Sequence, residues 1–282
     1  MRKYLSLIKF SHTIFAMPFA LIGFFLATKS NEFEWITLLY VVFCMIFARS
    51  AAMAFNRYID RDIDAANSRT AQVREIPNGN IKANSALIFV IINSLLFVTT
   101  TYLINSLCFL LSPIALLVIL GYSYTKRFTA LCHLILGLGL ALAPIGAYLA
   151  VTGEFDVIPL LFSVAVLFWV SGFDIIYSLQ DQEFDKEQTL HSIPVLIGTK
   201  NALNLSKTLH FLTFSALSIA GSFGDFSLYY WIGFGIFTTL LIYQHILVKH
   251  NDLSKVNLAF FTTNGIGSVI FGVFVIADLL IQ

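Results

Sequence analysis

Residues 56–64 follow a long apolar run and read Asn56-Arg57-Tyr58-Ile59-Asp60-Arg61-Asp62-Ile63-Asp64. At about 100° per residue, Asn56, Asp60 and Asp64 lie one turn apart on the same face of a helix, and Asp62 lies on the opposite side. This spacing puts an amide and two carboxylates on one face at the end of an apolar helix. Such a face indicates a site for a cation or for a ligand that carries one.

A second group of polar residues follows a later apolar run and consists of Asp174, Tyr177, Asp181 and Asp185. Asp181 and Asp185 are one helical turn apart, and Asp174 lies two turns before Asp181 on nearly the same face. Glu183 falls on the other face. Two carboxylate-bearing helix ends in one chain need a common explanation, and a divalent cation that holds a polyanion provides one.

The composition is that of a membrane protein. The chain has 282 residues, of which 58% are hydrophobic and 12% charged, with a mean hydropathy of +0.82. Soluble globular domains have roughly 25% charged residues. The net charge of +1 gives no reason to expect a nucleic-acid partner. Cys44, Cys108 and Cys132 are scattered in or beside apolar runs, which is typical of packing residues.

A membrane-spanning helix needs about 20 mostly apolar residues. About nine segments of the sequence meet this requirement. They run over Ile8–Thr28, Trp35–Phe55, Asn84–Ile104, Leu107–Tyr124, Leu131–Val151, Ile158–Leu179, Leu203–Gly221, Leu228–Val248 and Leu258–Leu280. We therefore expect one all-α, polytopic membrane domain over residues 1–282.

The basic residues select one side of the membrane. The loops on the side opposite to the N-terminus contain only Lys29. The N-terminal side carries Arg2, Lys3, Lys9, Arg57, Arg61, Arg69, Arg74, Lys82, Lys126, Arg127, Lys186, Lys200, Lys249 and Lys255. By the positive-inside rule, the N-terminus and the long loops lie in the cytoplasm and the C-terminus lies outside. Both acidic motifs then fall on the cytoplasmic side.

Carboxylates that face one another at the end of a membrane helix repel unless a cation separates them. Mg²⁺ suits this role, because it takes oxygen ligands and is typically held by one or two carboxylates together with substrate phosphates. The metal ligands predicted here are Asn56, Asp60, Asp64, Asp181 and Asp185. The second ligand would be a diphosphate, whose remaining charge calls for basic side chains. The basic candidates on the same side are Arg61, Arg69, Arg74, Lys126 and Arg127.

Two charged residues lie deeper in the apolar segments. Asp174 lies about two turns inside its helix, and an intramembrane acid is a candidate functional residue. Arg49 lies two turns before Asn56 on the same face, where it could meet Asp174 or an acidic acceptor. The remaining acids, Asp62 and Glu183, face away and are expected to be solvated.

These motifs resemble those of the UbiA superfamily of intramembrane prenyltransferases. The resemblance covers most of the chain and keeps the order of the motifs. N-x-x-x-D-x-x-x-D is matched by Asn56, Asp60 and Asp64; D-x-x-Y-x-x-x-D-x-x-x-D by Asp174, Tyr177, Asp181 and Asp185; Y-x-x-x-K-R by Tyr122, Lys126 and Arg127; and the Arg-Thr…Arg…Pro-x-Gly loop by Arg69, Thr70, Arg74, Pro77 and Gly79. The chain departs from many relatives in having Arg57 directly after the motif Asn.

The resemblance implies nine transmembrane helices around a central cavity, a cytoplasmic-side active site, and Mg²⁺ bridging the acidic motifs to a polyprenyl diphosphate. It also implies the reaction. The allylic C–O bond loosens, an aromatic ring carbon attacks the resulting cation, and a proton leaves. An apolar cavity within the lipid bilayer keeps water from the cation. Tyr122 and Tyr177 lie on the motif helices, where their rings could stabilise positive charge.

The acceptor stays open between aromatic acids. The stretch from Ala48 to Arg57 looks like the 4-hydroxybenzoate polyprenyltransferase branch, part of which acts on 1,4-dihydroxy-6-naphthoate in menaquinone synthesis. Ubiquinone or menaquinone biosynthesis in a bacterial inner membrane is therefore expected, and Arg49 is a candidate partner of the acceptor carboxylate. A haem or chlorophyll prenyltransferase of the same superfamily is an alternative.

A cation-coupled transporter is an alternative from another class of protein. It would also have about nine helices and intramembrane acids, but its binding site requires helices broken near the midplane. Pro144 and the Gly137/Gly139 pair are the only mid-helix candidates for such a break. The acids cluster at one surface instead, and this favours the enzyme.

Overall fold

The computed structural model describes residues 2–9 and 15–282. This part of the chain is built from helices and contains no β-strand. The helices are α1 (Arg2–Leu7), α2 (Met17–Ala27), α3 (Trp35–Ile59), α4 (Arg61–Ala66), α5 (Ala83–Ile104), α6 (Ser106–Thr125), α7 (Cys132–Thr152), α8 (Val157–Ser178), η2 (Leu179–Asp181), α9 (Gln182–Glu187), α10 (Ile193–Phe223), α11 (Leu228–Leu247), η3 (Leu258–Thr263) and α12 (Asn264–Ile281). The all-α membrane fold expected from the sequence is thus confirmed.

Seven helices in the described residues are long and apolar enough to cross a membrane. They correspond to the predicted segments except the first and the seventh, so the count of nine is not confirmed. The apolar helix α2 has only 11 residues, and residues 10–14 of the predicted first segment lie outside the described residues. The seventh segment belongs to α10, which begins ten residues earlier than predicted and is interrupted at Gly198, where φ is 78°.

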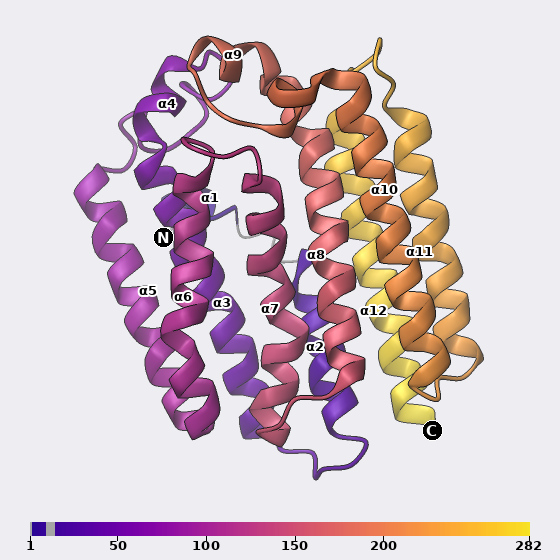
Figure 1. Cartoon of the computed structure of the whole chain (residues 1–282). Helices are drawn as coiled ribbons and strands as arrows, with labels where there is room; N and C mark the ends of the chain where they lie inside the picture. Colours follow the sequence, from indigo (N-terminus) through magenta and orange to yellow (C-terminus); the bar gives the residue numbers. More distant parts are fainter. Residues whose placement is uncertain (1, 10–14) are drawn as a thin grey trace.

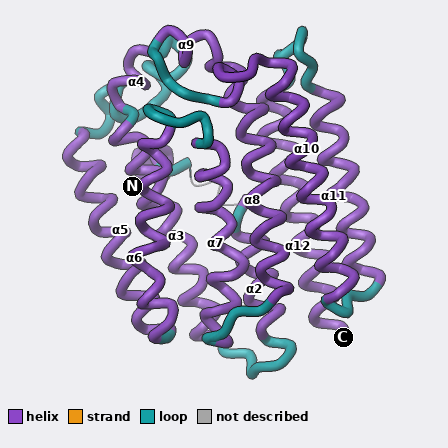
Figure 2. The backbone as a smooth tube through the Cα atoms, in the orientation of Figure 1, coloured by secondary structure: helices purple, strands orange, loops and turns teal. Residues whose placement is uncertain are grey.

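The helices lie side by side, and both acidic motifs are found at one end of them (Figure 1). The short helices α4 and α9, which follow the two motifs, cover that end, and the C-terminus lies at the opposite end (Figure 1). Figure 2 shows that loops are confined mostly to the two ends. The helix α7 runs unbroken through Pro144. The helix break that a transporter would need is therefore absent at the site where the sequence allowed one.

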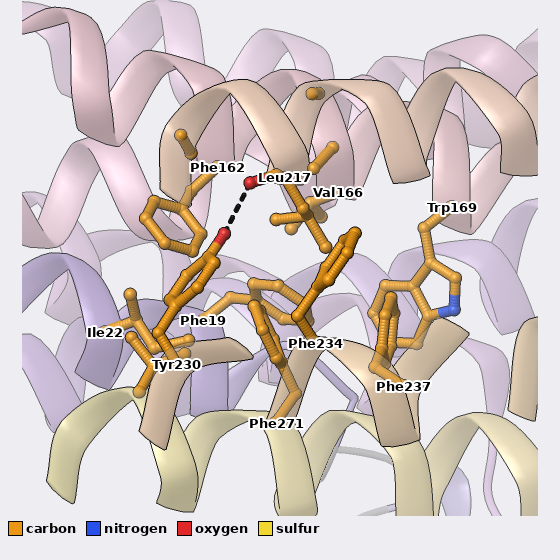
Figure 3. Packing of buried hydrophobic residues seen from close by; sticks show 14 of the residues in the cluster. Phe19, Ile22, Phe162, Val166, Trp169, Leu217, Tyr230, Phe234, Phe237 and Phe271 are labelled. Carbon is orange, nitrogen blue, oxygen red and sulfur yellow. Dashed lines mark hydrogen bonds between the residues drawn. The ribbon is translucent and has the colours of Figure 1, made fainter. Parts of the chain in front are cut away.

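The helices α8, α10, α11, α12 and α2 enclose a tightly packed aromatic core. Trp169, Phe162, Phe237 and Phe271 are each at most 1% exposed and pack against one another (Figure 3). The hydroxyl of Tyr230 donates a hydrogen bond to the carbonyl oxygen of Leu217 at 2.6 Å, so this buried polar group is satisfied (Figure 3). Dense packing of this kind makes this side of the molecule a rigid support for the second motif.

The helices α3, α5, α6 and α7 surround a cavity of about 370 Å³. Its wall is nearly all apolar and runs along α6 from Tyr122, beside the first motif, to Cys108 near the opposite end. Small residues of α7 line it, among them Gly139, Ala143 and Gly146. We call the half of the bundle around this cavity the hollow half, and the half around the aromatic core the solid half.

Candidate active site

The first acidic motif is not one continuous helix, as its spacing suggested, because α3 ends at Ile59 and α4 begins at Arg61. Arg127 donates a hydrogen bond from Nη2 to the carbonyl oxygen of Ile59 at 2.9 Å, so this carbonyl has a partner outside the helix. The i to i−4 bonds persist across the break, from Asp60 N to Asn56 O at 2.9 Å and from Asp64 N to Asp60 O at 2.7 Å. Asn56, Asp60 and Asp64 therefore remain one turn apart on the same face, as the sequence predicted, despite the break.

Asp60 is buried, with a side chain only 3% exposed, and three polar side chains surround it. Asn56 donates a hydrogen bond from Nδ2 to Oδ2 at 2.9 Å. Lys126 Nζ lies 3.1 Å from Oδ2, and Arg127 Nη2 lies 3.0 Å from Oδ1. The structure thus brings the Lys-Arg element at the end of α6 to the first acidic motif.

Asp64 is buried as well, and its Oδ1 forms an ion pair with Arg74. The hydroxyl of Thr70 donates a hydrogen bond to the backbone carbonyl of Asp64 at 2.8 Å, which ties the following loop to the motif. The other carboxylate oxygen, Oδ2, is buried without a hydrogen-bond partner in the described part of the chain. Gly79 lies in this loop with φ of 77°, a left-handed conformation that glycine adopts without steric cost.

Asp181, in the second motif, lies at the junction of η2 and α9 and is bonded to the loop that follows the first motif. Arg69 Nε donates to Asp181 Oδ1 at 3.0 Å, and Arg69 also forms an ion pair with Oδ2. Asn67 Nδ2 donates to Oδ1 at 3.1 Å, and Arg69 Nη1 donates to the Tyr177 hydroxyl at 3.1 Å. These bonds confirm that the two acidic motifs meet at one end of the bundle.

The contact with Asp181 keeps the Arg69 guanidinium positively charged. Burial lowers the pKa of its guanidinium, but the hydrogen bonds to Asp181 and Tyr177 and the charge of Asp181 outweigh burial and raise the pKa above its ordinary value. Arg69 therefore stays protonated over the whole pH range in which a protein is assayed.

The other charged residues of the two motifs are less enclosed. Asp62 is the most exposed, with 85% of its side chain accessible, and Glu183 is exposed too, as their helix faces predicted. Arg61 packs over the Tyr58 ring and lies 3.8 Å from Asp62, so it is set apart from the cations that contact the buried carboxylates. Asp185 is half-buried and has no ion pair among the described residues.

Asp174 meets a histidine, not the arginine that the sequence suggested as a partner. His133, at the start of α7, places Nδ1 2.7 Å from Asp174 Oδ2. Arg49 instead lines the cavity together with Tyr122, and its Nε is buried with no hydrogen-bond partner in the described part of the chain. The two intramembrane charges therefore belong to different parts of the site.

The residues fit a divalent cation that binds together with a ligand. In the described part of the chain, no three His, Cys, Asp or Glu side chains converge closely enough to hold a metal by themselves. The donors are nevertheless of the right kind, since Mg²⁺ prefers oxygen ligands such as carboxylates. Asp64 Oδ2 is buried without a hydrogen-bond partner among the described residues. Phosphate oxygens would complete the coordination.

Sequence reasoning missed three polar residues of this region. Asn67 and His133 contact motif aspartates, and the buried Arg57 donates from Nη1 to Asn56 Oδ1 at 3.2 Å. Arg57 was visible as a departure from the related motif, and Asn67 lies just before the Arg-Thr pair. His133 gave no signal, because it is a single histidine in an apolar run and its partner is 41 residues away.

The fold and the site define a membrane-embedded protein with acidic and basic side chains gathered at one end of an apolar cavity. The UbiA prenyltransferase family model matches residues 16–266, and the chain belongs to this family. It is thus an integral membrane enzyme that transfers prenyl groups.

Relatives extend over most of the chain. A 4-hydroxybenzoate octaprenyltransferase from Tolumonas auensis is 30% identical over 223 residues, which cover 79% of this chain and 77% of that protein. A 4-hydroxybenzoate octaprenyltransferase from Francisella tularensis is 29% identical over 236 residues, covering 84% and 81%.

Solved structures share the fold. The apo structure of a UbiA homologue from Aeropyrum pernix has a TM-score of 0.86 and 30% identity, with 95% of this chain and 98% of that chain covered. The structure of a UbiA homologue from Archaeoglobus fulgidus bound to DMAPP and Mg²⁺ has a TM-score of 0.77 and 21% identity, with 99% and 100% covered, and shows the likeness of the fold.

Proposed function

We propose that this enzyme transfers a polyprenyl group from polyprenyl diphosphate to a ring carbon of a hydroxylated aromatic acid, with Mg²⁺ as cofactor. The observation that carries the proposal is the position of the buried, ion-paired aspartates at one end of an apolar cavity of about 370 Å³. A polar site of this kind suits the charged head of a lipid diphosphate, and the cavity suits its tail.

In this proposal Asp60, Asp64, Asp181 and Asp185, with Asn56, would hold Mg²⁺, which would offset the charge on the departing diphosphate. Basic side chains would bind the remaining phosphate oxygens. Those that already contact motif carboxylates are Arg69, Arg74, Lys126 and Arg127. Arg61, which lies near the exposed Asp62, remains a candidate diphosphate ligand at the edge of the site.

The acceptor would lie where the cavity meets the motifs. Arg49 supports this assignment, because a guanidinium that lines an apolar cavity with an unpaired Nε is suited to a carboxylate. The Tyr122 ring lines the same cavity, and Tyr177 bonds to Arg69 beside Asp181. These two rings would face the positive charge that develops on the prenyl group.

The relatives named 4-hydroxybenzoate octaprenyltransferase support 4-hydroxybenzoate as the acceptor. The alternative acceptor is 1,4-dihydroxy-6-naphthoate, which would place the enzyme in menaquinone synthesis. Because both relatives are bacterial, we place the chain in a bacterial inner membrane. The distribution of Lys and Arg puts the active site on the cytoplasmic side and the C-terminus outside.

A two-acceptor assay on purified protein tests the proposal. Polyprenyl diphosphate and Mg²⁺ are supplied with 4-hydroxybenzoate in one reaction and 1,4-dihydroxy-6-naphthoate in the other, each with an EDTA control. The expected result is an EDTA-sensitive prenylated product with one acceptor only, which also assigns the pathway. Product that forms equally in EDTA would refute the metal role, and no product with either acceptor would refute the aromatic-acid assignment.

A further inference from the structure

A hydrogen bond between His133 and Asp174, the first residue of the second acidic motif, joins α7 to α8. His133 is 3% exposed, and its Nδ1 lies 2.7 Å from Asp174 Oδ2. The backbone N–H of Ile193 donates to His133 Nε2 at 3.3 Å. Since Nε2 accepts this bond, the ring proton resides on Nδ1, and His133 donates it to the Asp174 carboxylate.

Asp174 differs from Asp60, Asp64 and Asp181 in its partner. Asp185 also lacks an ion pair among the described residues, but it is one of the predicted metal ligands. Asp60, Asp64 and Asp181 each contact a Lys or Arg side chain, whereas Asp174 has no such contact within 4.0 Å in the described part of the chain. A carboxylate held by a permanent cation is a poor proton acceptor, because protonation would break the ion pair. Asp174 keeps one oxygen on His133, and 21% of its side chain is exposed.

The pair lies between the second motif's Asp181 and the part of α7 that lines the cavity. Asp174 lies on α8, seven residues or roughly 10 Å before Asp181, on the side away from the short helix α9. Leu136, one turn after His133 on α7, lines the apolar cavity. The pair therefore lies near the boundary between the diphosphate end of the site and the cavity.

The proposed transfer, on which this inference rests, releases one proton. The allylic C–O bond breaks and its electron pair leaves with the diphosphate. A pair of ring π electrons forms the new C–C bond, which leaves the attacked ring carbon with both its hydrogen and the prenyl group. The C–H electron pair then returns to the ring, and the proton must go to a base.

We propose that Asp174 accepts this proton and that His133 is the positioning residue that makes it able to do so. The Nδ1–H bond fixes the rotamer of the carboxylate and so aims its other oxygen. The Ile193 N–H bond in turn fixes the tautomer of His133. Each member of the chain Ile193, His133 and Asp174 thus orients the next.

The test compares His133→Leu with His133→Asn. Leucine is close to histidine in size but has no donor, whereas the asparagine amide nitrogen falls near the position of Nδ1 and can donate to Asp174. We expect His133→Leu to lower kcat about 10- to 100-fold without raising KM for the polyprenyl diphosphate. His133→Asn is expected to recover most of the lost rate.

A kinetic isotope effect separates this role from simple packing. With the active acceptor deuterated at the ring carbon that becomes prenylated, slower proton removal produces an isotope effect in His133→Leu and in Asp174→Asn that exceeds that of the wild type. The Asp174→Asn variant, which hardly alters size, provides this readout even if His133→Leu does not fold.

Two results would overturn the inference while wild-type turnover is intact. One is wild-type kcat in His133→Leu or Asp174→Asn. The other is an equal loss in His133→Leu and His133→Asn with an unchanged isotope effect. A wild-type enzyme that prenylates neither aromatic acid would instead refute the proposed function, so the two failures are distinguishable.

Discussion

The two halves of the molecule each carry one acidic motif at a break in a helix, but they hold it differently. Asp60 and Asp181 have nearly the same backbone conformation, with φ and ψ of −87° and 5° in the first and −105° and 3° in the second. The Asp60 side chain is 3% exposed and lies beside a hollow half, and the Asp181 side chain is 20% exposed and rests on a solid half.

The ion pairs of the two motifs show how the site is arranged before ligands bind. Three of the four carboxylates predicted to hold the metal are paired with cations that are predicted to bind the diphosphate. Lys126 and Arg127 contact Asp60, Arg74 contacts Asp64, and Arg69 contacts Asp181. We infer that metal and diphosphate bind together. The metal must replace the basic side chains at the carboxylates, and the diphosphate must replace the carboxylates at the basic side chains.

The largest effect is expected from removing one carboxylate charge in each half. Asp60→Asn and Asp181→Asn should each lower turnover by at least about 100-fold, because they weaken charge stabilisation at the departing diphosphate. Product formation with saturating Mg²⁺ measures the loss, and thermal unfolding in detergent confirms that the variants fold. Near-normal turnover in either variant would refute its assignment to the metal and diphosphate site.

The hollow half should set which prenyl chain lengths are accepted. Gly146 lines the cavity, and a Cβ built on it meets no atom within 4 Å. Gly146→Phe should therefore fill space meant for the tail and shift kcat/KM toward short diphosphates by about 10-fold or more. A series from dimethylallyl to octaprenyl diphosphate measures the shift.

A matched control for Gly146 exists in the solid half. Gly235 on α11 also has no atom within 4 Å of a built Cβ, but it is exposed and does not line the cavity. Gly235→Phe should leave the chain-length preference unchanged. An unchanged preference in Gly146→Phe, or the same shift in both variants, would refute the role of the cavity in holding the tail.

The packing difference predicts unequal stability losses for the same chemical change. Leu217→Ala, in the solid half at 0% exposure, should cost about 2–5 kcal/mol of unfolding free energy. Leu111→Ala should cost less, because Leu111 borders an existing cavity. Thermal unfolding of both variants in the same detergent gives the comparison, and equal losses would mean that the hollow half is packed as tightly as the solid half.

The smallest effect is expected at Asp62. Its side chain is 85% exposed, so Asp62→Asn should change turnover by less than about twofold, and stability by no more than about 0.5 kcal/mol. The assay used for Asp60→Asn measures it directly. A loss comparable to that of Asp60→Asn would show that Asp62 shares the ligand.

The sequence predicted those features of the site that depend on local spacing. Asn56 and Asp60 are bonded as their separation of four residues indicates, and Asp62 is exposed. It also placed the two motifs at one end of the bundle, because counting apolar segments fixes the direction of each helix. The bond between Arg69 and Asp181 confirms that placement.

Features that depend on packing between distant segments could not be predicted. At the helix break near Asp60, Arg127 donates a hydrogen bond to the carbonyl oxygen of Ile59, although the two residues are 68 positions apart in the sequence. The pairing of His133 with Asp174 likewise arises only when α7 packs against α8. The predicted first span, Ile8–Thr28, includes residues 10–14, which lie outside the described residues, so only its α2 part can be compared with the structure.

The most direct test of the central claim measures how an unreactive polyprenyl thiolodiphosphate binds to the purified wild-type enzyme by calorimetry, with Mg²⁺ and with EDTA. If the carboxylates and the cations exchange partners for metal and diphosphate together, the analogue should bind in Mg²⁺ and lose at least about tenfold in affinity in EDTA. Equal affinity under the two conditions would contradict the account, because the diphosphate would then bind without any metal held by the two motifs.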